Sequence, residues 1–367
     1  MSQIIAIAAG GTGGHFFPAE ALAAELKRRG HKVVLFTDGR SSGEKSEIFA
    51  DCPRYVLQGA GIAGRGFVKA TRAAFALARG TLKARSILRK IRPAAVVAFG
   101  GYPSVPPVLA SRLISPRPKV ILHEQNAVLG RANRQLSRFA SALALSFAKT
   151  SGIPSGVKAE LTGNPVRPAI AALAGRGYPV AGERFRLLVL GGSQGARVFS
   201  TLIPEMVSLL PETLSAKLDI AQQCRAEDLA QAERRYAEFG LKAELSPFFA
   251  DIAERLEAAH LVIARAGAST VAELAAIGRP SILIPLPGAI DDHQRENAIA
   301  LAEAGGGWMM HQSTLFPGDL AEFLTPLLGR PQELAAIAAA AAGFGRIDAA
   351  ERLADLVEQT IQPKDVA

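Results

Sequence analysis

The sequence predicts an α/β protein made of two doubly wound, Rossmann-like domains whose parallel sheets face a central cleft. Three observations carry this prediction. Short apolar runs alternate with helical patterns, and the order strand, glycine-rich turn, helix occurs twice, at 4–29 and again from residue 185. Two prolines interrupt the alternation at 163–168, which is therefore the expected linker. A chain of 367 residues is long enough for two domains of ordinary size.

The first half holds five apolar runs that predict buried parallel strands, with helical patterns between them. Strands joined in this way form right-handed βαβ units, and helices then cover both faces of the sheet. The strands are expected at 4–9, 33–36, 95–99, 120–123 and 142–146, and the helices at 16–29, 67–90, 105–112 and 129–139.

The second half repeats the pattern, with a strand at 185–190, a glycine-rich turn at 191–196 and a helix after it. Further strands are expected at 217–221, 261–264, 281–284 and 307–310, and 347–361 has helical periodicity. Ligands of doubly wound sheets bind beyond the carboxyl ends of the strands. Both glycine-rich turns fall at such ends.

Basic residues are concentrated in the first part of the chain. Residues 1–165 contain 24 of the 42 Lys and Arg residues but only 8 of the 33 Asp and Glu residues. No acidic residue occurs from Cys52 to His123, whereas thirteen basic residues do. This imbalance favours an anionic partner, either nucleic acid or a negatively charged membrane surface.

The composition excludes several classes of protein. A hydrophobic content of 49% with 20% charged residues is typical of a globular chain rather than a disordered one. Cys52 and Cys224 are far apart and are expected to be reduced, packed thiols of a cytoplasmic protein. No signal peptide is recognisable, and no run reaches the roughly 18 to 20 apolar residues that span a bilayer. The protein is expected to be soluble or peripheral.

The first glycine-rich turn, Gly-Gly-Thr-Gly-Gly-His at 10–15, lies between a predicted strand and a predicted helix. Backbone N–H groups at a helix N-terminus suit phosphate or a developing negative charge. The spacing differs from the dinucleotide fingerprint G-x-G-x-x-G. His15 beside such a turn favours group transfer over hydride transfer, and a purely structural tight turn is the alternative.

Three further groups of residues stand at predicted strand ends. One is another glycine-rich turn at 99–104. The second is the polar run His123, Glu124, Gln125 and Asn126, which favours a ligand site over packing. The third joins 265–273, where a strand enters a small-residue helix suited to diphosphate, to 291–297. Ordinary N-capping is the alternative for the Ser-Thr pair that opens this helix.

Metal chemistry and serine hydrolysis are poorly supported. The six histidines show no H-x-x-x-H pair, and Asp291-Asp292 is not a spaced D-x-D motif, so no metal and no cofactor are expected. Residues 191–195 fit the G-x-S-x-G nucleophile elbow around Ser193, and Asp291 and His293 follow in a suitable order. Both partners would have to come from one short segment, which disfavours a triad.

Six segments together resemble the peripheral membrane N-acetylglucosaminyltransferases of peptidoglycan synthesis. They extend over nearly 290 residues in the order found in that family. The segments are GGTGGHFFPA at 10–19, HEQNAVLGRANR at 123–134, GNPVR at 163–167, GGSQGA at 191–196, RAGASTVAEL at 265–274 and DDHQRENA at 291–298.

The resemblance implies a GT-B fold with an acceptor and membrane-associating domain at 1–163 and a UDP-GlcNAc-binding domain at 164–345. A C-terminal helix at about 346–362 would pack back on the first domain. It also implies inverting, metal-independent transfer of N-acetylglucosamine from UDP-GlcNAc to the C4 hydroxyl of the muramyl sugar of lipid I, giving lipid II. The expected place is the cytoplasmic face of the bacterial inner membrane, with other cell-wall synthesis proteins as further partners.

The resemblance also transfers individual donor-binding positions to this chain. Glu273 is expected on the ribose, Gln294 on the sugar and the Phe249 backbone on the uracil. The full set is Thr12, Gly13, Gly14, Asn126, Arg167, Ser193, Phe249, Ala268, Ser269, Thr270, Val271, Ala272, Glu273 and Gln294.

The reaction needs a base for the acceptor hydroxyl, and His15 is the first candidate and Glu124 the second. A turn histidine bonded to the backbone is the alternative for His15. The basic, apolar segment 66–92 is expected to dock on anionic lipid. Two rival functions stay open: another UDP-sugar enzyme such as a UDP-GlcNAc epimerase, and a nucleic-acid-binding protein that uses the basic half.

Overall fold

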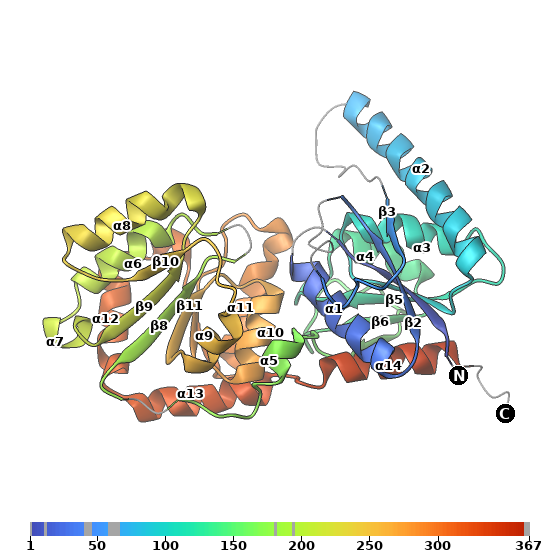
Figure 1. Cartoon of the computed structure of the whole chain (residues 1–367). Coiled ribbons are helices and arrows are strands. Elements are labelled where there is room, and N and C mark those ends of the chain that lie inside the picture. The colour runs from blue at the N-terminus through green and yellow to red at the C-terminus, as the bar shows by residue number, and fades with distance from the viewer. Residues whose placement is uncertain are drawn as a thin grey trace. The chain divides into compact units, whose positions relative to one another are not determined.

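The structure is a computed structural model that describes residues 2–10, 13–39, 46–57, 67–179, 182–192 and 195–362. The side chains of residues 67–70 are outside this description. The chain forms two compact units, Met1–Arg167 with Arg346–Ala367, and Pro168–Gly345 (Figure 1). Each unit contains one parallel sheet with helices against it, as the sequence predicts.

The sheet of the first unit has seven strands among the described residues, in the order β3-β2-β1-β4-β5-β6-β7, and every pair is parallel. Parallel pairing requires a crossover after each strand, and the helices between the strands provide it. The strands are β1 (Ile4–Ala8), β2 (Lys32–Thr37), β3 (Arg54–Val56), β4 (Ala95–Ala98), β5 (Lys119–Glu124), β6 (Ala142–Leu145) and β7 (Ala159–Leu161).

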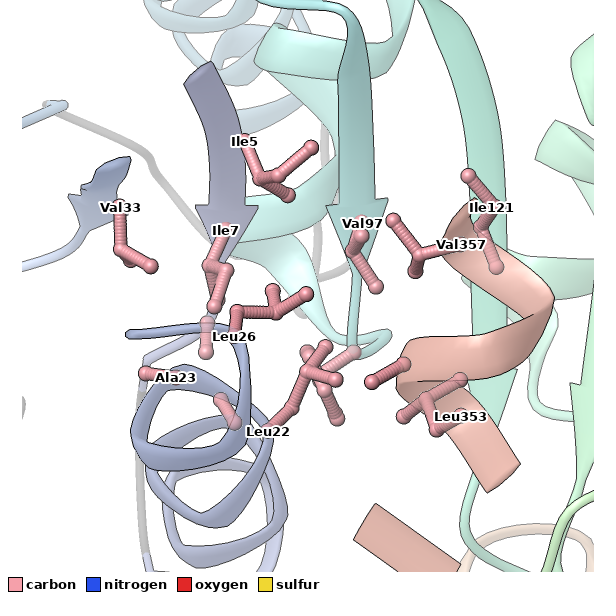
Figure 2. Close-up of a cluster of buried hydrophobic side chains, with 14 of the residues drawn as sticks. Ile5, Ile7, Leu22, Ala23, Leu26, Val33, Val97, Ile121, Leu353 and Val357 are labelled. Carbon is pink, nitrogen blue, oxygen red and sulfur yellow. The ribbon is translucent and has the colours of Figure 1, made fainter. Parts of the chain in front are cut away.

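Two layers of helices cover this sheet because successive residues of a strand face opposite sides. On β1, Ile5 and Ile7 face one core cluster while Ala6 and Ala8 face the other. The first cluster lies under α1 and α14, as Figure 2 shows. The second lies under α2 and α3. These helices are α1 (Gly13–Arg28), α2 (Phe67–Ile91), α3 (Val105–Ser111) and α14 (Ala349–Ile361), and the short α4 (Arg131–Leu136) follows β5.

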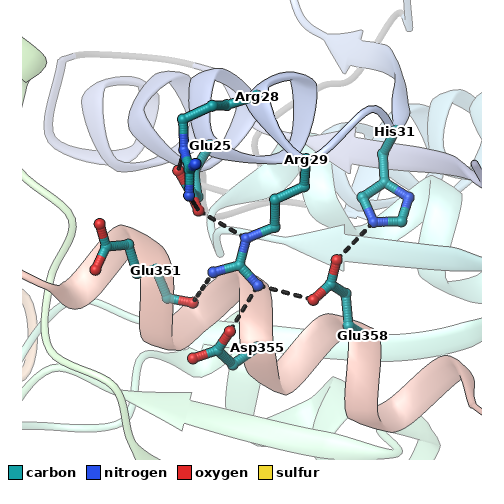
Figure 3. Close-up of polar contacts among 7 residues, drawn as sticks. All are labelled: Glu25, Arg28, Arg29, His31, Glu351, Asp355 and Glu358. Atoms are coloured by element: carbon teal, nitrogen blue, oxygen red, sulfur yellow. Dashed lines mark hydrogen bonds and ion pairs between the residues drawn. The ribbon is translucent and has the colours of Figure 1, made fainter.

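The C-terminal helix α14 is held on α1 by charge as well as by apolar packing. Arg29 follows α1 directly and donates to Glu25, Asp355 and Glu358 over 2.6 to 2.8 Å (Figure 3). His31 lies 2.8 Å from the second carboxylate oxygen of Glu358. The end of the chain is therefore part of the first unit.

The sheet of the second unit has six parallel strands in the part of the chain that is described, in the order β10-β9-β8-β11-β12-β13. The strands are β8 (Phe185–Leu190), β9 (Leu218–Gln223), β10 (Glu244–Ser246), β11 (Leu261–Ala264), β12 (Ser281–Leu283) and β13 (Gly307–Met309). The helices are α5 (Pro168–Ala171), α6 (Phe199–Ser208), α7 (Glu212–Ser215), α8 (Leu229–Glu238), α9 (Ile252–Ala258), α10 (Ala268–Ile277), α11 (His293–Glu303), α12 (Pro317–Leu328) and α13 (Pro331–Phe344).

One fully buried arginine joins three segments of the second unit. The Arg279 guanidinium is 1% exposed and donates to five backbone carbonyls. They belong to Gly177, to Leu256 and Glu257 of α9, and to the end of α10. Burial lowers the pKa of Arg279 to about 10, so the side chain remains charged at neutral pH. The carbonyl oxygens replace the water that this charge loses.

The structure corrects several predicted boundaries. Strands β3, β7 and β10 were not predicted, because each has only three residues and none is fully buried. The helix predicted at 16–29 begins earlier, at Gly13, so His15 lies in its first turn rather than before it. The helix expected directly after residue 196 begins only at Phe199.

The helix predicted at 129–139 is also wrong in its bounds. It begins at Arg131 and changes to a 3-10 turn at Ser137–Phe139. Gly130 is extended, with φ −62° and ψ 152°, and its N–H donates to the Glu124 carboxylate over 2.9 Å. This contact with a side chain sets the start of α4. The hydrophobic periodicity of the sequence gives no sign of such a contact.

Candidate active site

In each unit, several of the predicted site residues lie beside the point where the strand order reverses. In the first unit this point lies between β1 and β4, and in the second between β8 and β11. Crevices at such points are the usual ligand sites of open parallel sheets. The turn after β4 approaches His15, and those after β8 and β11 lead to Gly191 and Ala268.

His15 is oriented by backbone and side-chain acceptors. Its Nδ1 lies 2.7 Å from the Phe99 carbonyl oxygen and 3.1 Å from Oε1 of Gln125. Because both partners only accept hydrogen bonds, Nδ1 carries the hydrogen and Nε2 of the neutral ring keeps its lone pair. A Cβ at Gly101, whose φ is +67°, would lie 3.7 Å from Nε2 and so would touch this nitrogen.

Glu124 is a buried carboxylate, 2% exposed, that accepts four hydrogen bonds. Oε1 accepts from the backbone N–H and the side-chain amide of Asn126, at 3.0 and 3.1 Å. Oε2 accepts from Gly130 N–H and from Nδ2 of Asn133, both at 2.9 Å. All four donors hold the loop between β5 and α4 in one shape. Asn126 is thereby fixed at the end of β5.

Arg167 lies at the start of α1, although it is distant in sequence. Its guanidinium carbon is 4.8 Å from the centre of the Phe17 ring. The same ring packs closely over Gly13, where a Cβ would come within 2.6 Å of it. Gly13, Gly14 and Arg167 therefore surround one helix N-terminus. Thr12, also expected here, lies outside the described residues.

The second glycine-rich turn is tightly closed after β8. Gly195 N–H donates to the Gly192 carbonyl over 2.9 Å, and both residues have positive φ. A Cβ at Gly191 would lie 2.5 Å from the backbone nitrogen of Ala196. Only glycine fits at this position. Ser193, the expected donor contact and the hypothetical nucleophile, lies outside the described residues.

Helix α10 begins at Ala268 with Gly267 as its N-cap, and no side chain caps it. The N-capping interpretation of Ser269 and Thr270 is therefore wrong: both lie inside the helix. Val271 N–H is bonded back to Gly267, and the N–H groups before it emerge from the positive end of the helix. Glu273 is 7% exposed and lies one turn further along.

Two residues of the matching segments hold this helix start in place. Nδ2 of Asn297, which is fully buried, donates to the Ala266 carbonyl over 3.2 Å. Arg265 donates to the carbonyls of Ile284 and Pro285 and to Gln312. Their roles were missed because their partners are far away in sequence.

Gln294 lies in the first turn of α11, and Phe249 lies on the loop after β10. Oε1 of Gln294 accepts from Leu286 N–H over 2.9 Å and so ties α11 to the loop after β12. Phe249 is 5% exposed between β10 and α9, and the Arg255 guanidinium lies over its ring at 4.1 Å. Arg255 is fixed in turn by ion pairs with Glu244 and Asp251.

The described residues give the hydrolase alternative little support. Nδ1 of His293 donates to the Ile290 carbonyl over 2.6 Å rather than to a carboxylate. Within the described ranges no group of three His, Cys, Asp or Glu residues could hold a metal ion. Cys52 and Cys224 are both free thiols.

A cavity of about 1070 Å³ lies at the opposite end of the second sheet. It is lined by residues at the amino ends of β8 and β9, and the charged groups along it include the pairs Arg184–Asp219 and Arg255–Glu244. Basic and acidic side chains both line it, so the cavity points to no particular ligand.

Comparison with known proteins assigns both units. The glycosyltransferase family 28 N-terminal domain matches residues 5–145 and the family 28 C-terminal domain matches 186–353. A UDP-N-acetylglucosamine–N-acetylmuramyl-(pentapeptide) pyrophosphoryl-undecaprenol N-acetylglucosamine transferase from Granulibacter bethesdensis is 57% identical over 97% of this chain and 94% of its own. The chain belongs to this transferase family, MurG.

Other relatives agree with this membership. The transferase of the same name from Acidiphilium cryptum is 54% identical and covers 98% of both chains. The crystal structure of MurG from Acinetobacter baumannii superposes with a TM-score of 0.78 at 31% identity, over 97% of this chain and 99% of that one. The GT-B class implied by the motifs is thus confirmed.

The epimerase alternative receives support from the fold alone. A proposed UDP-N-acetylglucosamine 2-epimerase from Listeria monocytogenes has a TM-score of 0.70, over 99% of this chain and 97% of its own, at 16% identity. GT-B folds host different UDP-sugar chemistries, so this likeness assigns no activity. The MurG family is identified by identity over nearly the whole chain.

Proposed function

We propose that this protein transfers N-acetylglucosamine from UDP-GlcNAc to the C4 hydroxyl of the muramyl sugar in lipid I and so forms lipid II. Identity of 57% to a transferase of that name, over 97% of the chain, carries this proposal. The arrangement of His15 supports it, because two acceptors hold the hydrogen on Nδ1 and so leave Nε2 as the nitrogen that can act as a general base.

The proposed chemistry is a single inverting displacement without a metal. The C4 hydroxyl loses its proton to Nε2 of His15 while its oxygen attacks the anomeric carbon of the donor sugar. The bond from that carbon to the diphosphate breaks, and UDP leaves with the electron pair. Attack from the face opposite the leaving group inverts the configuration. The Phe99 carbonyl supports the imidazolium that forms.

The second unit is proposed to bind the donor. The N–H groups at the start of α10 and in the turn after β8 provide the positive field that a departing diphosphate needs. Glu273 would accept from the ribose hydroxyls, Gln294 would contact the sugar, and the backbone of Phe249 would contact the uracil. Ser193 and residues 268–272 would complete this site, and Thr12, Gly13, Gly14, Asn126 and Arg167 are proposed as further contacts of the donor.

Glu124 is proposed to position Asn126 rather than to act as the base. Each of its oxygens already accepts two hydrogen bonds. Taking up a proton would disrupt at least one of them. Among the described residues, both hydrogen-bond partners of His15 lie at Nδ1 and none lies at Nε2.

Helix α2 is proposed to dock on an anionic membrane surface, where a polyprenyl-linked acceptor resides. Phe75 is 71% exposed and Leu82 61% exposed. They lie seven residues apart on one helix face, beside exposed Arg79 and Lys83. Bulky apolar side chains among cations suit a lipid interface, whereas phosphate contacts of nucleic acid need cations only. Among the described residues no helix is long and apolar enough to cross a membrane.

Location at the cytoplasmic face of the bacterial inner membrane follows from this proposal. UDP-GlcNAc is a water-soluble donor and lipid I is held in the bilayer, so the reaction takes place at the surface between them. Other cell-wall synthesis proteins would meet the enzyme at that surface.

Transfer of radiolabelled N-acetylglucosamine to a lipid I analogue tests the function. We expect lipid II formation that is unaffected by EDTA. His15→Ala should lower kcat by about 100-fold or more, since a general base contributes roughly that factor. Glu273→Ala should mainly raise KM for UDP-GlcNAc. Consumption of UDP-GlcNAc without transfer would instead indicate an epimerase, and undiminished kcat in His15→Ala would disprove the base assignment.

A further inference from the structure

A chain of hydrogen bonds runs from His15 into the interior of the first unit. Oε1 of Gln125 accepts from Nδ1 of His15 over 3.1 Å. Nε2 of Gln125 donates to the Phe99 carbonyl over 2.8 Å and to Nδ1 of His123 over 3.2 Å. Nε2 of His123 donates to the Gly163 carbonyl over 3.1 Å. Gln125 and His123 are 2% and 0% exposed.

The direction of every bond in this chain is determined by its ends. The Gly163 carbonyl can only accept, so His123 carries its hydrogen on Nε2 and presents a lone pair at Nδ1. That lone pair, together with the Phe99 carbonyl, takes both hydrogens of the Gln125 amide. The amide oxygen therefore faces His15. Reversal of the amide would place an N–H group against the Nδ1–H of His15.

Burial keeps His123 in the required state. Loss of solvation lowers the pKa of His123 to about 4, so the ring is neutral at neutral pH and accepts at Nδ1. Its ring packs 5.1 Å from that of Phe99, which restricts its rotation. The Gly163 carbonyl at the other end of the chain of hydrogen bonds is also fixed in position. Gly163 has a φ of +86° and packs so closely that a Cβ there would come within 2.8 Å of Arg346 Cβ.

We infer that Gln125 is a positioning residue for His15: its carbonyl oxygen, oriented by His123, holds Nδ1–H in place and stabilises the imidazolium formed during transfer. This inference rests on the proposed role of His15 as the base. When Nε2 takes the hydroxyl proton, Nδ1 keeps its own hydrogen, and no proton passes to Gln125. The amide is a neutral counterpart of the carboxylate that orients the histidine of a catalytic triad.

The tautomers of His15 and His123 in the unsubstituted protein provide a test that needs no substrate. Nitrogen-15 NMR of the protein labelled at its six histidines should show His15 protonated on Nδ1 and His123 protonated on Nε2. Signals are assigned by their loss in His15→Ala and His123→Phe. Opposite tautomers at these two positions support the hydrogen-bond direction derived above. A His15 ring protonated on Nε2 alone would overturn the inference, whatever the activity of the enzyme.

Kinetics of Gln125→Leu test the effect on the reaction. A hydrogen bond to a charged group contributes about 1.5 to 3 kcal/mol, so kcat should fall roughly 10- to 100-fold while KM for UDP-GlcNAc stays within about twofold. Gln125→Met, which keeps the length of the side chain, should show a loss in the same direction. Unchanged kcat in both variants would overturn the inference.

Gln222 offers a matched control in the second unit. It is also fully buried, its Nε2 donates to the Phe199 carbonyl, and its Oε1 accepts from Tyr236. Gln222→Leu should lower the melting temperature as Gln125→Leu does, yet leave kcat and the His15 signals unchanged. An equal loss of kcat in the control would show general loosening and overturn the specific role. If the wild-type protein transfers no sugar, the proposed function fails while the tautomer result still stands by itself.

Discussion

Some polar side chains at the strand ends of the first unit stabilise loops rather than take part in the reaction. Glu124 is an example. Sequence reasoning identified it as a second candidate base, and the structure surrounds its carboxylate with four donors from Asn126, Gly130 and Asn133. A carboxylate used in this way maintains the geometry of its neighbours.

Glu124→Gln is therefore expected to cost stability as well as activity. The new amide group faces two donors, and leaving them unsatisfied costs about 1 to 3 kcal/mol. We expect a lower melting temperature together with a lower kcat. Glu47→Gln, at an exposed position of the same unit, should change neither. Loss of nearly all turnover at an unchanged melting temperature would identify Glu124 as the base instead.

Some residues of the candidate site could be predicted from the sequence and others could not. His15 could be identified because it directly follows a glycine-rich turn between a predicted strand and a predicted helix, although the bond of its Nδ1 to the Phe99 backbone also fits the structural alternative. The connecting roles of Gln125, Asn133 and Asn297 were missed, since each depends on a partner brought near by the fold.

At the scale of elements, α2 differs from the other helices of the first unit in what its outer face carries. Ala84 and Leu88 pack against the sheet, whereas Phe75 and Leu82 project into solvent. Helix α2 has no acidic residue, and its exposed aromatic and aliphatic side chains form an apolar surface that no other part of the unit covers among the described residues.

Replacing both exposed side chains with serine should weaken membrane binding selectively. Burying a Phe or Leu side chain fully contributes about 1.5 to 3 kcal/mol. We therefore expect sedimentation with anionic liposomes to fall at least about tenfold in Phe75→Ser/Leu82→Ser. Leu209→Ser alters an equally exposed leucine, 58%, of the second unit and should have no effect. Undiminished liposome binding, or binding to RNA alone, would contradict the role of α2.

Central strands were predicted more accurately than edge strands or helix starts. Strand β11 matches its predicted bounds because a four-residue buried run allows few alternatives. Helix α4 starts at Arg131 because the Gly130 N–H is bonded to the carboxylate of Glu124, six residues earlier. Local patterns record burial and propensity, and such side-chain contacts to the backbone are absent from them.

At the scale of the molecule, the chain returns to its first unit through α14. Leu353 and Val357 enter the same core as Ile5 (Figure 2), and Arg29 bonds three carboxylates from α1 and α14 (Figure 3). The hydrogen bond to Arg28 is the main reason that the pKa of Glu25 is lowered, and the bond to His31 is the main reason for Glu358.

These two carboxylates make the first unit acid-sensitive. Because their pKa values are lowered in the folded state, their stabilisation is complete above the ordinary glutamate pKa, about 4.3, and is lost as the pH falls through the lower folded values. Arg29→Met should weaken the fold at pH 7 and lose less further stability between pH 5 and 3 than the wild type. Urea midpoints followed by circular dichroism measure this difference.

An arginine that does not join α1 to α14 provides a control for Arg29→Met. Arg352 is 47% exposed and pairs with Asp348 at the start of its own helix. Arg352→Met should keep the pH dependence of the wild type. Identical pH dependence in all three proteins would show that Arg29 and its partners do not couple α14 to α1.

The sequence by itself determined the α/β class, the two sheets, the family and the motifs at the strand ends, because periodicity and motif spacing are local properties of the chain. The tertiary structure decided what His15, Glu124 and Gln125 do for one another. Residues 15, 99, 123, 125 and 163 come together only when β1, β4, β5 and the segment after β7 align at one edge of the sheet. The direction of a hydrogen bond depends on both partners, and here the second partner is brought near the first only by the tertiary fold.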